Sequence, residues 1–362
     1  DGGGTGRQPG SAFKPFTLAK AFEEGATPDR SYSGPSSYTI PHCTGKDCTV
    51  HNAESGGFGT IDLRQAIAHS VNTVFAQLIR DVGVKETAEM AHRLGLTMVN
   101  PAGTLPDGQP YRERLTLGVA ETSPLDMAAA YSVFANRGVQ LPATPVLKVT
   151  DARGKVLEDN TARSGKRVID QGIADNVTEL LKGVIAFGTG RGADIGRPDG
   201  AAGKTGTTEN NTDAWFVGYT PHLSTSVWMG YADSQTPLHG IKGVGEVFGG
   251  TFPAQTWKDY MTKVLENAPP DDFPPPAPLP SVATTSPSST APLFRAPPST
   301  VIVVPTEPPF TVFVPRPPPT YAPLSIPPYP SIPTTRSPYT LPPTITQPPR
   351  SPTTLPFPLV PH

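Results

Sequence analysis

The chain has 362 residues and a formal net charge of −2, from 29 lysine and arginine residues against 31 aspartate and glutamate residues. This near balance lacks the basic footprint of nucleic-acid binding, so we expect no nucleic-acid partner. The sequence contains no run of 18 apolar residues and no signal peptide, and it therefore predicts no transmembrane or signal segment in this chain.

The prolines divide the chain into two parts, because 32 of the 47 lie within the last 94 residues. A segment so rich in proline and poor in charge cannot bury a core. We expect residues 268–362 to form a disordered proline-rich tail, and residues 1–267 to form one domain with a sizeable core.

Apolar residues recur at helical spacing in the first hundred residues and predict helices over 11–24, 60–81 and 84–95. Thr60 is a suitable cap for the second of these helices. Ser70 and Asn72 compete for backbone hydrogen bonds in its interior, so we expect a break there. Turn residues dominate 26–59, which we expect to be a long loop.

Ser123 and Pro124 form a clear helix start, as its cap and its first residue. Further helices are expected over 124–136, 170–187 and 253–267, and a hairpin over 146–157. Short runs rich in β-branched and aromatic residues predict antiparallel strands over 204–208, 214–219 and 226–231. Helices followed by an antiparallel sheet indicate an α+β fold.

Cys43 and Cys48 are the two cysteines of the chain, and they lie in a segment rich in turn residues. With His42 and His51 they offer enough ligands for a zinc site, and two free thiols are a further alternative. We favour a local disulfide, formed in an oxidising compartment, and expect no metal.

Ser11 and Lys14 are candidates for a nucleophile and its base. At a spacing of i, i+3 on a helix their side chains share one face and can meet. A serine hydroxyl needs a base to take its proton, and a lysine can act as that base when burial or a nearby cation lowers its pKa. Lys204 offers the second cation and Ser70 a proton relay, while a helix N-terminus offers N–H groups to an oxyanion.

Three short motifs each occur once, as Ser11-x-x-Lys14, Ser70-x-Asn72 and Lys204-Thr205-Gly206. Each alone has a purely structural interpretation: a helix cap, a helix break, or a strand entering a turn. Together and in this order they match the signature of penicillin-binding proteins and related serine enzymes.

Longer segments resemble the transpeptidase domain of class A penicillin-binding proteins over about residues 5–267. These segments are Arg7-Gln8-Pro9-Gly10-Ser11-x-Phe13-Lys14-Pro15-Phe16, Ala202-Gly203-Lys204-Thr205-Gly206-Thr207-Thr208, Asp213-Ala214-Trp215-Phe216-Val217-Gly218-Tyr219 and Phe248-Gly249-Gly250-Thr251-Phe252-Pro253, with 117–125 and 131–138 in support. The proline-rich tail further resembles that of actinobacterial, mycobacterial-type members.

The resemblance implies the fold of penicillin-binding proteins and serine β-lactamases, an antiparallel sheet with helices. Ser11 would attack the penultimate D-Ala carbonyl of a peptidoglycan stem peptide and release the terminal D-Ala, and a second stem peptide would accept the acyl group. Penicillin and other β-lactam antibiotics would acylate the same serine. Lys14 would be the general base, and no cofactor is implied.

The resemblance also assigns the remaining site residues. Ser70 would relay a proton to the leaving nitrogen, Asn72 would hold the substrate amide and help to place Lys14, and Lys204 would keep the pKa of Lys14 low and attract the substrate carboxylate. The oxyanion hole would consist of the N–H groups of Ser11 and Thr207. The expected substrate-binding residues are Thr205, Gly206, Thr207 and Thr208.

Class A members carry a membrane anchor and a glycosyltransferase domain before the transpeptidase, and sheet strands before the serine helix. This chain begins about ten residues before Ser11, so we expect an N-terminally truncated domain with exposed apolar surface beside that helix and an open sheet edge. The resemblance implies a site in the cell envelope, at the outer face of the cytoplasmic membrane, with the anchor in the absent part.

Several other functions remain open. A β-lactamase would need a carboxylate to activate water, and Glu121 is available. A D-alanyl-D-alanine carboxypeptidase differs mainly in the acceptor. An inactive fragment would be a cell-wall binding or scaffold module, whose P-x-x-P spacings suit cell-division or elongation proteins, although a flexible spacer fits the tail equally well.

Overall fold

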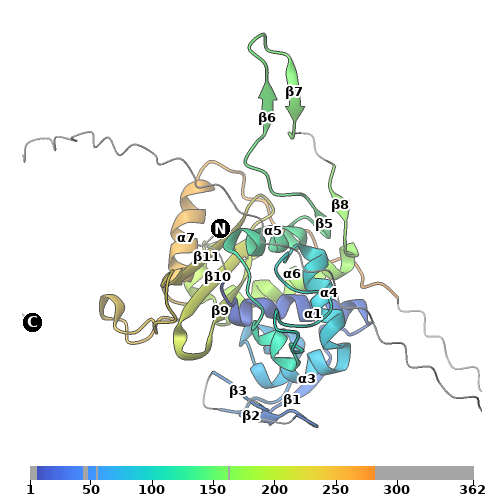
Figure 1. Ribbon diagram of the computed structural model, residues 1–362, viewed down its shortest axis with the longest axis vertical. Helices are drawn as coiled ribbons and strands as arrows, with labels where there is room; N and C mark the ends of the chain where they lie inside the picture. Colours follow the sequence, from blue (N-terminus) through green and yellow to red (C-terminus); the bar gives the residue numbers. More distant parts are fainter. Residues whose placement is uncertain (1–5, 44–47, 54–55, 162–163, 282–362) are drawn as a thin grey trace, which may run out of the picture. The chain divides into compact units, whose positions relative to one another are not determined.

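A three-stranded antiparallel sheet forms the centre of the computed structural model, which describes residues 6–43, 48–53, 56–161 and 164–281 (Figure 1). The order of the strands is β11-β10-β9, and their bounds are Ala202–Thr207 for β9, Asp213–Tyr219 for β10 and Ser224–Gly230 for β11. The expected strands and their antiparallel order are therefore confirmed, with ends shifted by about two residues.

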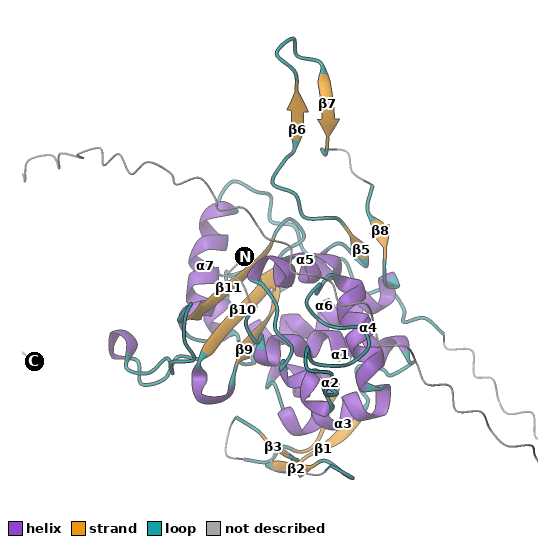
Figure 2. Ribbon diagram, in the orientation of Figure 1, coloured by secondary structure: helices purple, strands orange, loops and turns teal. Residues whose placement is uncertain are grey.

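The middle strand β10 is buried along its whole length, with its side chains alternating between two cores. Trp215, Val217 and Tyr219 belong to the large core formed with the N-terminal helices. Phe216 points to the opposite face, where it packs against Trp257 of α7 (Phe252–Val264). The sheet is thus covered on both faces, as Figure 2 shows by secondary structure.

The helical side confirms most of the expected elements. Its helices are α1 (Lys14–Glu23), α2 (Leu63–Ala68), α3 (Asn72–Val82), α4 (Val84–Leu94), α5 (Pro124–Ala135) and α6 (Gln171–Ala186). Ser123 caps α5 as expected, since its Oγ accepts a 3.0 Å bond from the Asp126 N–H. Short 3-10 turns lie at η1 (Gly10–Phe13), η2 (Glu113–Leu117), η3 (Arg191–Ala193), η4 (Glu209–Asn211) and η5 (Ile241–Gly243).

The expectation of a long loop over 26–59 was wrong. Two small sheets occupy this region, in which β1 (Ser31–Gly34) pairs with β4 (Gly59–Asp62) and β2 (Ser37–Thr39) pairs with β3 (Thr49–His51). These strands are too short and too polar to show an alternating pattern. Thr60 lies within β4 and does not cap a helix; the Asp62 carboxylate caps α2 by accepting from the Gln65 N–H at 2.8 Å.

The expected hairpin is confirmed as β6 (Lys148–Thr150) and β7 (Val156–Asp159), both exposed along their length. The Asp151 carboxylate closes its turn by accepting from the N–H groups of Arg153 and Lys155, each at 2.9 Å. A two-residue pairing of β5 (Val139–Gln140) with β8 (Lys166–Arg167) was not expected.

The apolar surface that we expected to be exposed does not include the serine helix, because the apolar side chains of α1 are buried. The expected sheet edge is present in the described ranges, where β11 pairs with β10 alone and its seven residues are half-buried. Within those ranges no helix combines the length and apolar character that crossing a membrane requires. A disulfide joins Cys43 to Cys48, as we favoured.

Residues 268–281 continue along the domain after α7. Phe273 and Leu279 pack against the large core, and the Phe273 N–H donates a 2.8 Å bond to the Asp199 carbonyl. Contacts with the domain therefore extend past the boundary expected at residue 267. The predictions of disorder and of partner binding for the rest of the tail fall on residues 282–362, outside the described part of the chain.

Candidate active site

Ser11 lies in the 3-10 turn η1, and the α-helix proper begins at Lys14. In a 3-10 turn the side chains at i and i+3 eclipse one another, which brings the two residues together more closely than an α-helix would. The Lys14 Nζ lies 2.9 Å from the Ser11 Oγ. Ser11 is half-buried whereas Lys14 is fully buried, so the serine is partly accessible to solvent and its lysine partner is not.

The Lys14 amine has four oxygens within hydrogen-bonding distance. Besides the Ser11 Oγ, these are the Ser70 carbonyl at 2.7 Å, the Ser70 Oγ at 3.0 Å and the Asn72 Oδ1 at 2.6 Å. Burial, and secondarily the charge of Lys204, hold the pKa of Lys14 well below its usual range. A neutral amine has one lone pair and two N–H groups, so it can accept the Ser11 proton while donating to two of the other three oxygens.

The break between α2 and α3 is confirmed and it positions Ser70. Ser70 adopts a left-handed conformation, with φ at 57°, which is uncommon outside glycine. The Val71 N–H donates a 2.9 Å bond to the Ala66 carbonyl and helps to fix this corner. As a result the Ser70 Oγ lies between two amines, 3.0 Å from the Lys14 Nζ and 2.9 Å from the Lys204 Nζ.

Asn72 is the first residue of α3 and connects the lysine to a neighbouring strand. Its Oδ1 accepts from Lys14, and its Nδ2 donates a 2.8 Å bond to the His51 carbonyl at the end of β3. The amide is therefore held from both ends. This geometry places Lys14, while the expected contact of Asn72 with a substrate amide stays a prediction.

Lys204 lies on β9 and is fully buried. Its Nζ donates to the Ser70 Oγ, to the Thr205 carbonyl at 3.0 Å and to the Thr205 Oγ1 at 3.2 Å. Burial lowers the pKa of Lys204 to about 7. Two buried amines thus share one serine hydroxyl, and within the described part of the chain the oxygens that contact them are all neutral. One full charge is easier to accommodate here than two.

Close backbone contacts bring η1 against β9. A Cβ on Gly206 would lie 2.2 Å from the Pro9 carbonyl oxygen, and a Cβ on Gly10 would lie 2.5 Å from the Thr207 oxygen. Gly10 also has a positive φ of 57°. The glycines therefore let the turn carrying Ser11 reach the end of β9, which brings the two residues of the expected oxyanion hole, Ser11 and Thr207, to one place.

The threonines that follow Lys204 have different surroundings. Thr205 contacts the Thr189 hydroxyl at 2.7 Å, and the Thr207 Oγ1 accepts from the Gly249 N–H at 3.1 Å. The Thr208 Oγ1 is engaged within the turn between β9 and β10, where it accepts from the Asp213 N–H at 2.9 Å. The structure therefore gives Thr208 a local role in that turn.

Sequence reasoning missed two residues that support the site. Thr189 lies between two glycines after α6, and this flanking pattern was the available signal. Tyr131 of α5 is fully buried, and its hydroxyl donates a 2.6 Å bond to the carbonyl of Ala12, next to the nucleophile. Its position in α5 gave no indication of this contact. Among the described residues, no group of three or more metal-ligating side chains is present.

Comparison with known proteins agrees with this geometry. The model of the penicillin binding protein transpeptidase domain matches residues 5–252. This chain belongs to that family. The same family was expected from the three motifs.

Individual relatives extend the match. Penicillin-binding protein 1A of Mycobacterium tuberculosis is 35% identical over 285 residues, which cover 75% of this chain and 34% of that protein. Penicillin-binding protein 1A of Aquifex aeolicus is 34% identical over 268 residues, 74% of this chain and 34% of the relative. The chain thus spans about a third of the length of these curated relatives.

Solved structures show the same fold. The PonA1 protein of M. tuberculosis in complex with penicillin V is 32% identical, with a TM-score of 0.68, and the alignment covers 76% of this chain and 73% of that one. Penicillin-binding protein 1A of Haemophilus influenzae is 27% identical, with a TM-score of 0.62 over 75% of this chain and 44% of its own. The penicillin-binding protein and β-lactamase-like α+β fold is therefore confirmed.

Proposed function

We propose that the chain is a serine D,D-transpeptidase, which cross-links peptidoglycan stem peptides through an acyl-enzyme at Ser11. Penicillin acylates the same serine. One observation carries the proposal: a fully buried lysine amine, with its pKa lowered, lies 2.9 Å from a half-buried serine hydroxyl. A lysine whose pKa is lowered in this way gives up its proton more readily than an exposed lysine and can serve as a general base.

The proposed reaction follows from the contacts of the two amines. Lys14 takes the proton of the Ser11 hydroxyl as Oγ attacks the penultimate D-Ala carbonyl, and the N–H groups of Ser11 and Thr207 receive the oxyanion. Ser70, in contact with both amines, passes the proton taken up by Lys14 to the leaving nitrogen, and D-Ala departs. The amine of a second stem peptide then attacks the ester and gives a proton to Lys14, which returns it to the Ser11 Oγ as the cross-link forms and Ser11 is released. With a β-lactam the leaving nitrogen stays attached, so the acyl-enzyme persists.

Substrate binding is proposed along β9. This strand pairs with β10 alone among the described residues, so an extended peptide can lie along its other edge by strand addition. Lys204 supplies the positive charge for the terminal carboxylate, with Thr205 and Thr207 as hydrogen-bonding partners. Peptidoglycan lies outside the cytoplasm, and we therefore propose that the chain acts in the cell envelope.

The proposal is tested by incubating the chain with a fluorescent penicillin. We expect a persistent covalent label that Ser11→Ala abolishes and that the exposed control Ser37→Ala retains. Rapid loss of the label would instead indicate a β-lactamase. Against that activity, Glu121, the carboxylate available to activate water, is exposed, and Lys14 is the group in contact with Ser11. A label that survives Ser11→Ala would contradict the proposal.

Transpeptidation itself is tested with a stem-peptide donor and an amine acceptor. We expect a cross-linked product together with free D-Ala. Release of D-Ala with water as the only acceptor would identify a carboxypeptidase.

A further inference from the structure

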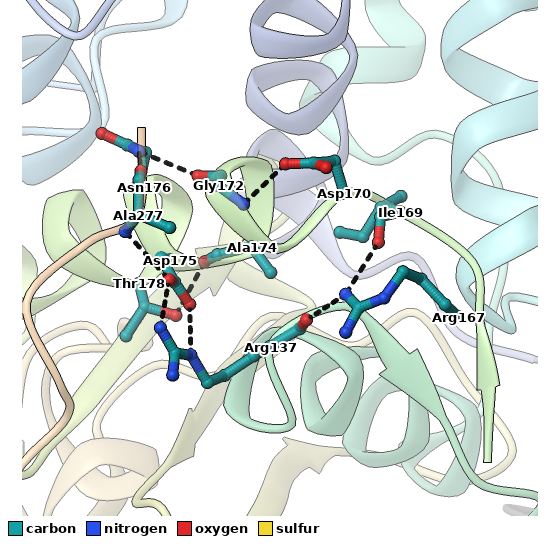
Figure 3. Close-up of polar contacts among 10 residues, drawn as sticks. All are labelled: Arg137, Arg167, Ile169, Asp170, Gly172, Ala174, Asp175, Asn176, Thr178 and Ala277. Carbon is teal, nitrogen blue, oxygen red and sulfur yellow. Dashed lines mark hydrogen bonds and ion pairs between the residues drawn. The ribbon is translucent and has the colours of Figure 1, made fainter. Parts of the chain in front are cut away.

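The first residues of the proline-rich segment lie against α6. They contact the side chains of two consecutive residues of that helix, Asp175 and Asn176. The Ala277 N–H donates a 3.0 Å bond to the Asp175 Oδ2, and the Ala277 carbonyl accepts a 3.0 Å bond from the Asn176 Nδ2 (Figure 3). Both backbone polar groups of Ala277 are thus bound by side chains of the helix.

Contacts on either side of Ala277 fix the segment in place. The Pro278 carbonyl oxygen lies 1.9 Å from the position that a Cβ on Gly172 would take, so only glycine leaves room for it. Leu279 packs against the large core. Four residues before Ala277, Phe273 packs edge-on against Tyr219 of β10, with ring centroids 5.6 Å apart.

The acceptor in this site is held independently of the segment. The Asp175 side chain is 5% exposed, and Arg137 at the end of α5 donates to it twice, at 3.0 and 2.7 Å. Burial opposes the charged carboxylate, but hydrogen bonds from Arg137 and Ala277 outweigh it and lower the pKa of Asp175. The Arg137 carbonyl is in turn held by Arg167 at 2.7 Å. The carboxylate is therefore already oriented toward an incoming N–H.

An oriented acceptor can select one register in a proline-rich chain, because proline has no N–H. Between residues 274 and 278 of the sequence Phe273-Pro274-Pro275-Pro276-Ala277-Pro278-Leu279, Ala277 is the one residue with an N–H to donate. The tripeptide Ala-Pro-Leu also recurs in the tail sequence, at 291–293 and 322–324.

We propose that Gly172, Asp175 and Asn176 form a binding site for a proline-rich segment containing Ala-Pro-Leu, occupied by the chain's own residues 277–279. Such segments favour the extended polyproline II conformation and lose little entropy on binding. Tethering adds an effective concentration in the millimolar range. The site fixes the start of the tail on the domain and does not depend on the chemistry at Ser11.

The test measures the reactivity of a thiol placed in the segment. Cys43 and Cys48 are joined in a disulfide, so Leu279→Cys introduces a single free thiol, and its reaction with a thiol reagent reports release of the segment. Adding Gly172→Ala should raise the rate several-fold, since the new Cβ takes the place of the Pro278 oxygen. Gly183→Ala, in the same helix, is the matched control and should leave the rate unchanged, because its Cβ would meet only the ring of Phe187, which is exposed and can move aside. Alanine has a higher intrinsic helix propensity than glycine, so a loss of propensity does not explain the expected increase.

A peptide in trans tests recognition directly. A synthetic peptide of residues 271–281 at millimolar concentration should raise the rate of Leu279→Cys labelling by displacing the tethered segment. The same peptide with Ala277→Pro lacks the N–H that Asp175 accepts and should have no effect. Equal labelling with and without Gly172→Ala, a peptide without effect, or equal effects of the two peptides would overturn the proposed site.

Discussion

Lys14 and Lys204 bring two amines of the same sign to one hydroxyl, whereas Asp175 and Arg137 bring opposite charges together. The contacts of the lysines are with neutral oxygens, and burial lowers the pKa of each. The Asp175 carboxylate is nearly as buried, yet a bidentate guanidinium keeps it charged. A lysine amine that is buried without a counter-charge becomes a reactive base. A carboxylate that is buried with a counter-charge becomes a fixed binding and structural element.

The largest expected effect is on acylation by Lys14→Met. Removing the base should lower the rate constant for acylation by penicillin by about 10²–10⁴-fold. The free energy of unfolding should stay the same or rise, because burial lowers the pKa of Lys14 relative to the unfolded chain and this cost to folding is absent from the variant. Stopped-flow acylation and urea denaturation measure the two. A Lys14→Met variant that penicillin acylates as fast as the wild type, or one with a clearly lower free energy of unfolding, would contradict the proposed difference between the two lysines and the Asp175–Arg137 pair.

Arg137→Met should have the opposite profile. It leaves a buried carboxylate without its cation and should lower the free energy of unfolding by about 1–3 kcal/mol, with acylation by penicillin largely retained. Arg153→Met is the control, since that side chain is 92% exposed and lies 4.0 Å from its acidic partner. Equal stabilities for the two variants in urea denaturation would show that the Asp175 pair is not a structural element.

Tyr131→Phe should have a smaller effect, which tests whether Tyr131 positions the turn that carries Ser11. Loss of its hydrogen bond to the Ala12 carbonyl should slow acylation about 2- to 10-fold, corresponding to one net hydrogen bond. The pH dependence of the acylation rate constant should be unchanged, because Tyr131 positions the turn and takes no part in proton transfer. Tyr111→Phe, also buried and hydrogen-bonded through its hydroxyl to the Asn100 N–H, is the matched control. A Tyr131→Phe rate equal to that of the control would exclude this role.

The sequence was sufficient for features that local chemistry determines. Capping by Ser123, the break at Ser70 and the strand carrying Lys204 followed from propensity and motif, and the order of the motifs indicated which residues would meet. The left-handed φ of Ser70 and the 3-10 turn at Ser11 arise from tertiary contacts, which propensity does not contain.

Two other regions were beyond prediction for a different reason. The strands within 26–59 are paired by backbone hydrogen bonds between short polar segments, so no hydrophobic period marks them. Residues 271–281 dock through the backbone of Ala277 and two apolar anchors. A composition dominated by proline indicates the conformation of such a segment but not the surface that binds it.

The pH dependence of acylation tests whether Lys14 is the neutral base and Lys204 the retained cation. As pH rises, Lys14 loses its proton and the acylation rate constant should rise, on a limb well below the ordinary lysine value of 10.5. Above about pH 7, Lys204 becomes neutral and the rate constant should fall. In Lys204→Met the rising limb should move to higher pH, because a neighbouring charge is removed. The assignment of the two lysines would be contradicted if the acylation rate constant of the wild type rose until pH 10.5. It would also be contradicted if Lys204→Met left the rising limb of the pH profile at the same pH.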